Sequence, residues 1–248
     1  MREKHHMKSI SRAIDHCRIT LVIGLIAIST GQLSGQLNLK IGYTLGFYSP
    51  EVHNNIVTIH DMQRSLSFDQ YNEARPLNLA FGINLGLRYK TDFGNFEFSW
   101  ESLARTTSSV GILRPPDPAP LSSSSNEFRY RFNMLMVTYE SIFGLIGVGS
   151  TLGVNLASLD QVVQGTTDEF DLLGESPSGN DQYFARLHLS FNFAGNSSVA
   201  FAIKPYIQIP ITNIDLSSFA SVLDVQNAET QESYPAWGLS FTFYNGRQ

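Results

Sequence analysis

The sequence predicts an all-β protein: a closed, antiparallel, up-and-down transmembrane β-barrel of eight strands, with four long outer loops and three short periplasmic turns. Three observations carry this prediction. Apolar residues alternate with small or polar residues in eight segments, the polar positions are rich in glycine, and long and short connections alternate strictly. The barrel is expected to cover residues 36–248.

The alternation has a period of two residues, the period at which strand side chains change face. In the first segment, Leu37 and Leu39 share one face while Asn38 and Lys40 share the other. A tilted transmembrane strand needs roughly 9–11 residues, so segments of this kind can cross a bilayer. The eight segments cover residues 37–47, 77–89, 96–101, 128–134, 146–156, 183–193, 199–211 and 236–243.

The fourth segment is the least regular. Its aromatic residues and Met134 are expected to face outward, which places Arg129 and Arg131 inward. The alternation blurs after Leu135, and this predicts a β-bulge at that point.

Alternation alone leaves open a soluble, lipocalin-like barrel with its apolar face inside. Two features favour the membrane. Glycine weakens a solvated strand face but suits a narrow interior, and the polar face carries many glycines. Nearly every apolar position also holds a large side chain, and together these would overpack one narrow core. The glycines are Gly42, Gly46, Gly82, Gly86, Gly147, Gly149, Gly153 and Gly238.

The connections support the same architecture, because outer-membrane barrels have short turns on one side and longer loops on the other. Tight turns are expected at 91–95, 141–144 and 195–198, and long loops at 50–76, 111–127, 158–181 and 213–233. The loops are expected to be solvated, with short helices within 52–71 and 216–225.

Residues 1–35 are predicted to be a signal peptide. Five basic residues precede an apolar run from Ile19 to Ser29, which at about eleven residues is too short to span a membrane as a helix. Small residues follow, with cleavage expected after Gly31 or Gly35; Met1 and Met7 both remain candidate starts. The alternative is a buried apolar helix of a soluble domain.

The predicted mature chain is acidic and free of cysteine. Removing the five basic and two acidic residues of 1–36 leaves 12 basic and 20 acidic residues, a net charge of −8. This balance argues against a nucleic-acid partner. The single cysteine, Cys17, lies in the leader, so disulfides and thiol catalysis are excluded for the mature chain.

Segments 42–47 and 82–89 and the closing run 237–244, together with the leader, resemble small outer-membrane β-barrel proteins. The similarity is greatest to the PorT-like family of Bacteroidetes, and OmpX-like barrels are more distant. The resemblance implies an outer-membrane location and roles in secretion-machinery assembly, adhesion or envelope integrity. One departure is that Asn245 to Gln248 follow the last aromatic residues, where such barrels often end on an aromatic.

Charged residues collect on the predicted inner face, where charges must be paired to be tolerated. They predict a salt-bridge network that fills the lumen, with an anion path or anion site as the alternative. The network is predicted to comprise Lys40, Arg88, Glu97, Glu101, Arg105, Arg129, Arg131, Arg186, His188 and Lys204.

The function predicted is non-enzymatic and structural or interaction-based, exercised through the long loops or through envelope partners. The expected partners are outer-membrane lipid or lipopolysaccharide and proteins of the envelope or secretion machinery. The alternatives are a lipid A-modifying enzyme and a narrow anion-preferring channel. An enzyme would use a histidine near Ser65 or Asp61, with His53 and His60 as candidates. No motif predicts a catalytic residue, metal site or cofactor.

Overall fold

The computed structural model describes residues 36–113, 122–163, 169–171, 181–194 and 199–245. The predicted signal peptide and the turn at 195–198 lie outside these residues. Residues 36–245 belong to one compact unit. Within the described residues, no helix is both long and apolar enough to cross a membrane.

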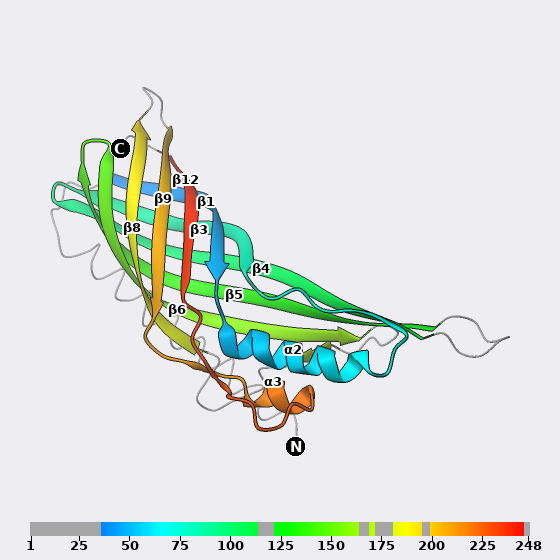
Figure 1. Ribbon diagram of the computed structural model, residues 1–248. Helices are drawn as coiled ribbons and strands as arrows, with labels where there is room; N and C mark the ends of the chain where they lie inside the picture. Colours follow the sequence, from blue (N-terminus) through cyan, green and yellow to red (C-terminus); the bar gives the residue numbers. More distant parts are fainter. Residues whose placement is uncertain (1–35, 114–121, 164–168, 172–180, 195–198, 246–248) are drawn as a thin grey trace, which may run out of the picture. The chain divides into compact units, whose positions relative to one another are not determined.

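Eight long strands close into an antiparallel, up-and-down barrel (Figure 1), so the predicted fold class is confirmed. Each strand pairs with its neighbour in the chain, and the last strand pairs with the first, from Lys40 opposite Tyr244 to Tyr48 opposite Ala236. The strands are β1 (Gln36–Tyr48), β3 (Leu79–Thr91), β4 (Gly94–Leu113), β5 (Ser122–Phe143), β6 (Ile146–Val163), β8 (Asp181–Ala194), β9 (Val199–Pro210) and β12 (Ala236–Asn245).

The outer surface carries a belt of exposed apolar side chains, as the alternation predicts. Aromatic residues pair at both edges of this belt. Phe47 stacks on Trp237 at one edge, with ring centroids 4.3 Å apart, and Phe201 lies 4.9 Å from Phe243 at the other. An apolar band bounded by aromatic rings is the surface of a transmembrane β-barrel. More than half exposed are Leu37, Leu39, Ile41, Val137, Leu152, Leu187, Ile207 and Trp237.

At the short-turn end, two described turns are two residues long: Asp92–Phe93 joins β3 to β4, and Gly144–Leu145 joins β5 to β6. Gly144 has a φ of +66°, in the left-handed region that glycine adopts without strain. The first residue of β1 and the last of β12 lie at this same end of the barrel.

At the opposite end, three strands continue past the others and form what we call the upper wall: Ser102–Leu113 of β4, Ser122–Asn133 of β5 and residues 158–163 of β6 (Figure 1). The sequence assigned parts of these stretches to loops, and that assignment is wrong. Two short strands extend the wall: β2 (Gln70–Asn72) pairs with β4, and β7 (Glu169–Asp171) pairs with β6.

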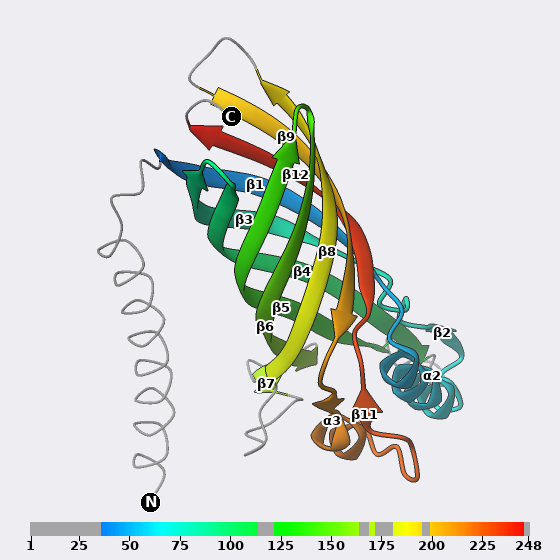
Figure 2. The same ribbon diagram turned by 90° about the vertical axis from the view of Figure 1, so that its left-hand side faces the viewer.

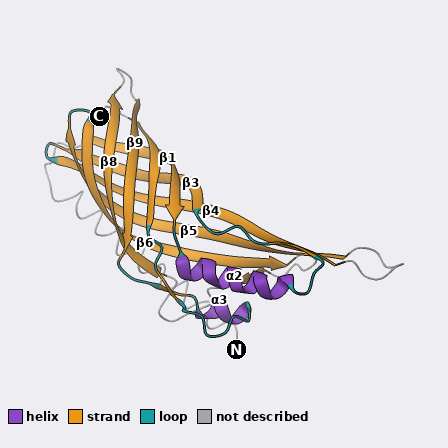
Figure 3. Cartoon of the chain, in the orientation of Figure 1, coloured by secondary structure: helices purple, strands orange, loops and turns teal. Residues whose placement is uncertain are grey.

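The inner side of the upper wall is covered by what we call the cap. The cap consists of helix α2 (Glu51–Ser65), helix α3 (Ser217–Val222) and the two-stranded sheet of β10 (Ile214–Asp215) and β11 (Gln231–Glu232) (Figure 3). Figure 2 shows α2 and α3 at the end of the barrel opposite the short turns. Helices were expected in both loops, but the loops are not simply solvated: Ile56 and Phe219 are fully buried.

The structure also corrects the predicted direction of Leu77 and the bulge predicted in β5. Leu77 was expected on the outer face but is fully buried beneath the cap, because β3 begins only at Leu79. In β5, the pairing with β4 runs without interruption from residue 122 to 140 and the pairing with β6 from residue 126 to 143, so the predicted bulge is absent.

What changes along β5 is the chemistry of each face, not the register. In the lower half of β5, from residue 135 to the short turn, the outward side chains are apolar, as at Leu135 and Val137. In the upper half, which has the lower residue numbers, Phe128, Tyr130 and Phe132 turn inward and pack against the cap. The sequence reading assigned these residues outward because it assumed one apolar face for the whole strand.

Candidate functional site

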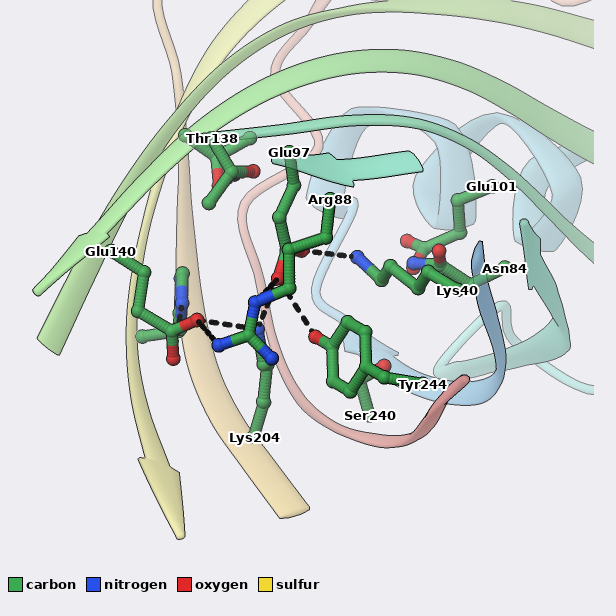
Figure 4. Close-up of polar contacts among 12 residues, drawn as sticks. Lys40, Asn84, Arg88, Glu97, Glu101, Thr138, Glu140, Lys204, Ser240 and Tyr244 are labelled. Atoms are coloured by element: carbon green, nitrogen blue, oxygen red, sulfur yellow. Dashed lines mark hydrogen bonds and ion pairs between the residues drawn. The ribbon is translucent and has the colours of Figure 1, made fainter. Parts of the chain in front are cut away.

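The centre of the lower barrel interior is a buried cluster of charged side chains, shown in Figure 4. Glu97, from β4, receives three hydrogen bonds: from Lys40 Nζ at 2.8 Å, from Lys204 Nζ at 3.1 Å and from the Tyr244 hydroxyl at 2.8 Å. The Nε atom of Arg88 lies 3.8 Å from the same carboxylate. Five strands therefore meet at one carboxylate, since Lys40, Lys204 and Tyr244 come from β1, β9 and β12 and Arg88 comes from β3.

A second carboxylate, Glu140 of β5, shares these cations. Lys204 Nζ lies 3.1 Å and Arg88 Nη2 3.7 Å from one of its oxygens, and His188 Nε2 lies 3.9 Å from the other. The Arg88 nitrogens make no hydrogen bond within the described residues. Arg88 is instead held by the two carboxylates and by the ring of Tyr244, whose centroid is 4.3 Å from its guanidinium carbon.

The third carboxylate, Glu101, forms a separate group nearer the cap. It accepts hydrogen bonds from Arg186 Nη2 at 2.8 Å, Thr44 Oγ1 at 2.7 Å and Asn84 Nδ2 at 2.8 Å. Arg186 also donates to Gln208 at 2.8 Å and lies over the ring of Tyr206. The hydrogen-bond donors to Glu101 thus come from three other strands, β8, β1 and β3, and Gln208 of β9 joins the group through Arg186.

These contacts leave little free space. A cavity of about 30 Å³ lies among Lys40, Glu97, Arg186, His188 and Lys204, room for roughly one water molecule. Buried charges of this kind stabilise a structure only when every partner is present, because removing one leaves an uncompensated charge. The arrangement therefore joins the strands through the lumen rather than presenting charge to a solute.

The structure brings together seven of the ten residues predicted for the lumen network. These are Lys40, Arg88, Glu97, Glu101, Arg186, His188 and Lys204, all of them buried. Arg105 also lies on the inward face of β4, but above the cluster, in the upper wall.

Arg129 and Arg131 do not belong to the network, and their inward assignment is wrong. Their side chains are 38% and 53% exposed on the outside of the upper wall. Arg129 Nε lies 2.6 Å from Glu127, and Arg131 Nη2 lies 3.9 Å from Asp160. The error follows from the change of apolar face in β5, which put the aromatic residues inside and the arginines outside.

The predicted network did not include the carboxylate Glu140, the tyrosines Tyr206 and Tyr244, or the uncharged polar residues Thr44, Asn84 and Gln208. Glu140 lies on the same face of β5 as Thr138, because both occupy even positions, so continuing the period of two past Leu135 would have found it. Tyr244 continues the inward series of Ser240 and Thr242 in β12. The prediction considered charged side chains and histidine, whereas a tyrosine hydroxyl can also bond a buried carboxylate.

Both cap histidines, His53 and His60, are buried. His53 stacks on Phe219, and its Nδ1 atom is 3.3 Å from Asn54 Oδ1. Burial lowers the pKa of His53 to about 4. His60 bonds the carbonyl of Leu223, and burial lowers its pKa as well. Asp61 instead accepts hydrogen bonds from the Tyr71 hydroxyl and the Ala74 amide, each at 2.6 Å.

Neither histidine therefore meets Ser65 or Asp61 as a catalytic pair within the described residues. Nor does this part of the chain hold a group of three or more His, Cys, Asp or Glu side chains that could bind a metal ion.

No protein-family model matches the chain, and no curated protein matches it. A comparison with solved structures found the following similarities. Neisserial surface protein A has a TM-score of 0.44 and 8% identity, covering 86% of this chain and 99% of that one. The attachment invasion locus protein Ail of Yersinia pestis, in complex with the heparin analogue sucrose octasulfate, has a TM-score of 0.43 and 11% identity, covering 85% and 98%. A second structure of Ail has a TM-score of 0.41 and 13% identity, with the same coverage. The fold described above rests on this chain's own strand pairing.

Proposed function

We propose that the protein is an outer-membrane β-barrel with a closed lumen, and that its role is structural or interaction-based rather than enzymatic or channel-forming. The barrel holds the upper wall and the cap outside the membrane, where they contact envelope partners. The lipid surface around the belt is outer-membrane lipid, including lipopolysaccharide.

One observation carries the membrane location: the exchange of chemistry between the two faces of β5. The outward side chains change from apolar to polar between Leu135 and Asn133, and the inward ones change from polar to apolar between Thr138 and Met136. A soluble barrel would keep its apolar side chains inside along its whole length. The exchange fits a strand that passes from a bilayer, where apolar groups face lipid, into water, where they face a core.

The closed lumen is supported by the pairing of its charges. Lys40, Arg88 and Lys204 are each held by Glu97 or Glu140, so none is left to attract a passing anion. Eight strands also leave an interior just wide enough for side chains. The anion-channel alternative would require these ion pairs to separate during conduction.

An interaction role is supported by the size of the upper wall. Twelve residues of β4 and twelve of β5 continue past the belt, which at about 3.3 Å per residue extends each strand by about 40 Å. A rigid sheet held above a membrane can present side chains to another protein. Membership of the PorT-like family, and with it a role in secretion-machinery assembly, is part of this proposal.

Membrane fractionation followed by gel electrophoresis of heated and unheated samples tests the location. We expect the protein in the outer-membrane fraction, with a faster band before heating. A soluble fraction with one unchanging band would refute the proposal.

Planar-bilayer recording tests the closed lumen separately. We expect no steady conductance, and large stable pores would contradict a lumen filled by paired charges. Comparison of lipid A from cells with and without the protein tests the enzyme alternative, which predicts a change in acylation.

A further inference from the structure

The upper wall contains a gap in its hydrogen-bond ladder, on the side of β4 that faces β2 and β3. β3 pairs with β4 up to Phe81 opposite Ala104, and β2 pairs with it from Asn72 opposite Val110. Among the residues that the structure describes, none pairs with residues 105–109 of β4 on that side. The two pairings are connected by the eight residues 73–80, whereas the gap on β4 is only five residues long. Because the connection is three residues longer than the gap, the chain bows away from β4 instead of pairing with it.

Within the described part of the chain, the gap leaves the main-chain groups of Thr106 and Ser108 outside the ladder. The Asp69 amide donates to the Ile112 carbonyl at 3.0 Å, so the even-numbered residues of β4 direct their main-chain groups toward this side. Two N–H groups and two carbonyls therefore line the opening. Unpaired main-chain groups at a strand edge are strong sites for binding through hydrogen bonds.

A hollow of about 830 Å³ lies along this free edge, a volume within the range of small-molecule sites. Both faces of β4 line it, the inward Arg105 and Thr107 as well as the outward Thr106 and Ser108, which is possible only where the strand edge is open. The segment opposite contributes Tyr71, Asn72, Glu73 and Arg75.

The charged groups of the hollow favour an anion. Arg105 and Arg75 both line it, against one carboxylate, Glu73. The Nε atom of Arg105 is buried and has no hydrogen-bond partner within the described residues, although a buried donor without a partner is costly. Guanidinium groups bind phosphate and carboxylate oxygens through paired N–H donors.

From these features we propose that the hollow binds a phosphorylated saccharide. Arg105 and Arg75 bind the phosphate oxygens, and the hydroxyls and free main-chain groups of Thr106 and Ser108 bind the sugar hydroxyls. An added peptide strand fits less well, because the gap spans only five residues and is closed at both ends by β2 and β3.

The hollow lies above the belt. Thr106, which lines it, is six residues further along β4 than Trp100. The same chemistry could come from the headgroup of an outer-leaflet glycolipid or from a soluble phosphorylated glycan. The site itself does not depend on the membrane assignment; only the choice of a glycolipid source does.

Nuclear magnetic resonance of the ¹⁵N-labelled protein in phosphate-free micelles tests the site. We expect inorganic phosphate, and more strongly a phosphorylated oligosaccharide released from lipopolysaccharide, to shift the Thr106 and Ser108 amide signals. Arg105→Gln and Arg75→Gln should each weaken binding about tenfold, as expected for the loss of a charge-assisted hydrogen bond. Arg129→Gln, on the outside of the same wall, is the matched control and should leave affinity unchanged.

Nanodiscs with and without lipopolysaccharide separate the two sources. Tighter binding of intact lipopolysaccharide than of its oligosaccharide identifies a membrane glycolipid, whereas equal affinity identifies a soluble glycan; both support the site. No shift with any probe, or a shift that both arginine variants leave intact, would overturn it. Heat-modifiable mobility shows that each variant is folded, and it reports on the barrel independently of this titration.

Discussion

The two halves of β5 have the same backbone geometry and opposite side-chain chemistry. In the lower half, Val137 faces outward with 55% of its surface exposed, while Glu140 lies buried inside. In the upper half, Phe128 and Tyr130 are buried inside, while Arg129 faces outward. Both pairing registers are continuous across the change. The comparison teaches that strand alternation fixes which residues share a face, whereas the surrounding medium decides which face is apolar.

The largest expected effect concerns charge, which is buried in the lower half and exposed in the upper. Glu97→Gln leaves Lys40, Arg88 and Lys204 around a neutral side chain and should lower the free energy of unfolding by about 3–5 kcal/mol. Urea unfolding in lipid vesicles measures this. Glu127→Gln, which breaks the exposed pair with Arg129 in the upper half, should cost less than about 1 kcal/mol. Equal losses would contradict a buried network.

The outer faces of the two halves should respond in opposite ways to charge. Val137→Arg places a cation against the lipid and should cost about 2–4 kcal/mol, depending on its depth. Arg131→Val, on the outer face of the upper half, should change stability by less than about 0.5 kcal/mol. The same urea experiment compares the two variants. If Val137→Arg does not lower stability, the belt does not contact lipid.

The cap should loosen in acid while the barrel below stays intact. The pKa of His53 lies near 4 in the folded cap and near 6.5 once the ring is released. The released form therefore binds more protons between these values, and the cap loses up to about 3 kcal/mol as pH falls through that window. Glu232, which accepts a hydrogen bond from the His53 amide, has a raised pKa and opposes this trend at the acidic end.

Amide hydrogen exchange of α2, corrected for intrinsic rates, follows this opening. His53→Phe keeps a ring against Phe219 but cannot titrate, so its protection should fall less between pH 6.5 and 4. If protection falls equally in both proteins, His53 is not the group that responds.

The smallest effect is expected at the junction between the cap and the upper wall. Tyr71→Phe removes the 2.6 Å hydrogen bond to Asp61, and a bond to a charged group contributes about 1.5–3 kcal/mol. Because Asp61 keeps the Ala74 amide as a donor, we expect the lower end of this range. The loss should appear as faster protease cleavage between α2 and β3, with heat-modifiable mobility unchanged; a global loss of stability would show that the cap and barrel unfold together.

Most of the barrel could be predicted because a period of two is visible wherever one face is apolar and the other is not. The lower network followed from the same pattern, which correctly faced Glu97, Arg186 and Lys204 inward. The upper half of β5 could not be assigned by continuity, because the apolar stripe moves to the other face without a break in the chain. Glu140 was not predicted for the same reason, because the alternation was not continued past Leu135.

The cap was harder to predict because its strands and α3 are short. The buried residues His53, Ile56, Val57 and His60 lie at helical spacing on one face of α2, but no sequence pattern reveals that this face packs against the inside of a protruding sheet. The hollow beside Arg105 depends on a mismatch in length between residues 73–80 and 105–109, which is visible only once the register is known.

The change of face in β5 also determines how deeply the barrel can sit. Sinking by two residues along a tilted strand lowers it by about 5 Å and draws Asn133, then Arg131, among acyl chains. Rising by the same step lifts Leu135 into water. The protein is therefore matched to one hydrocarbon thickness, and a thicker or thinner bilayer must deform around it, because hydrophobic mismatch cannot be relieved by sliding.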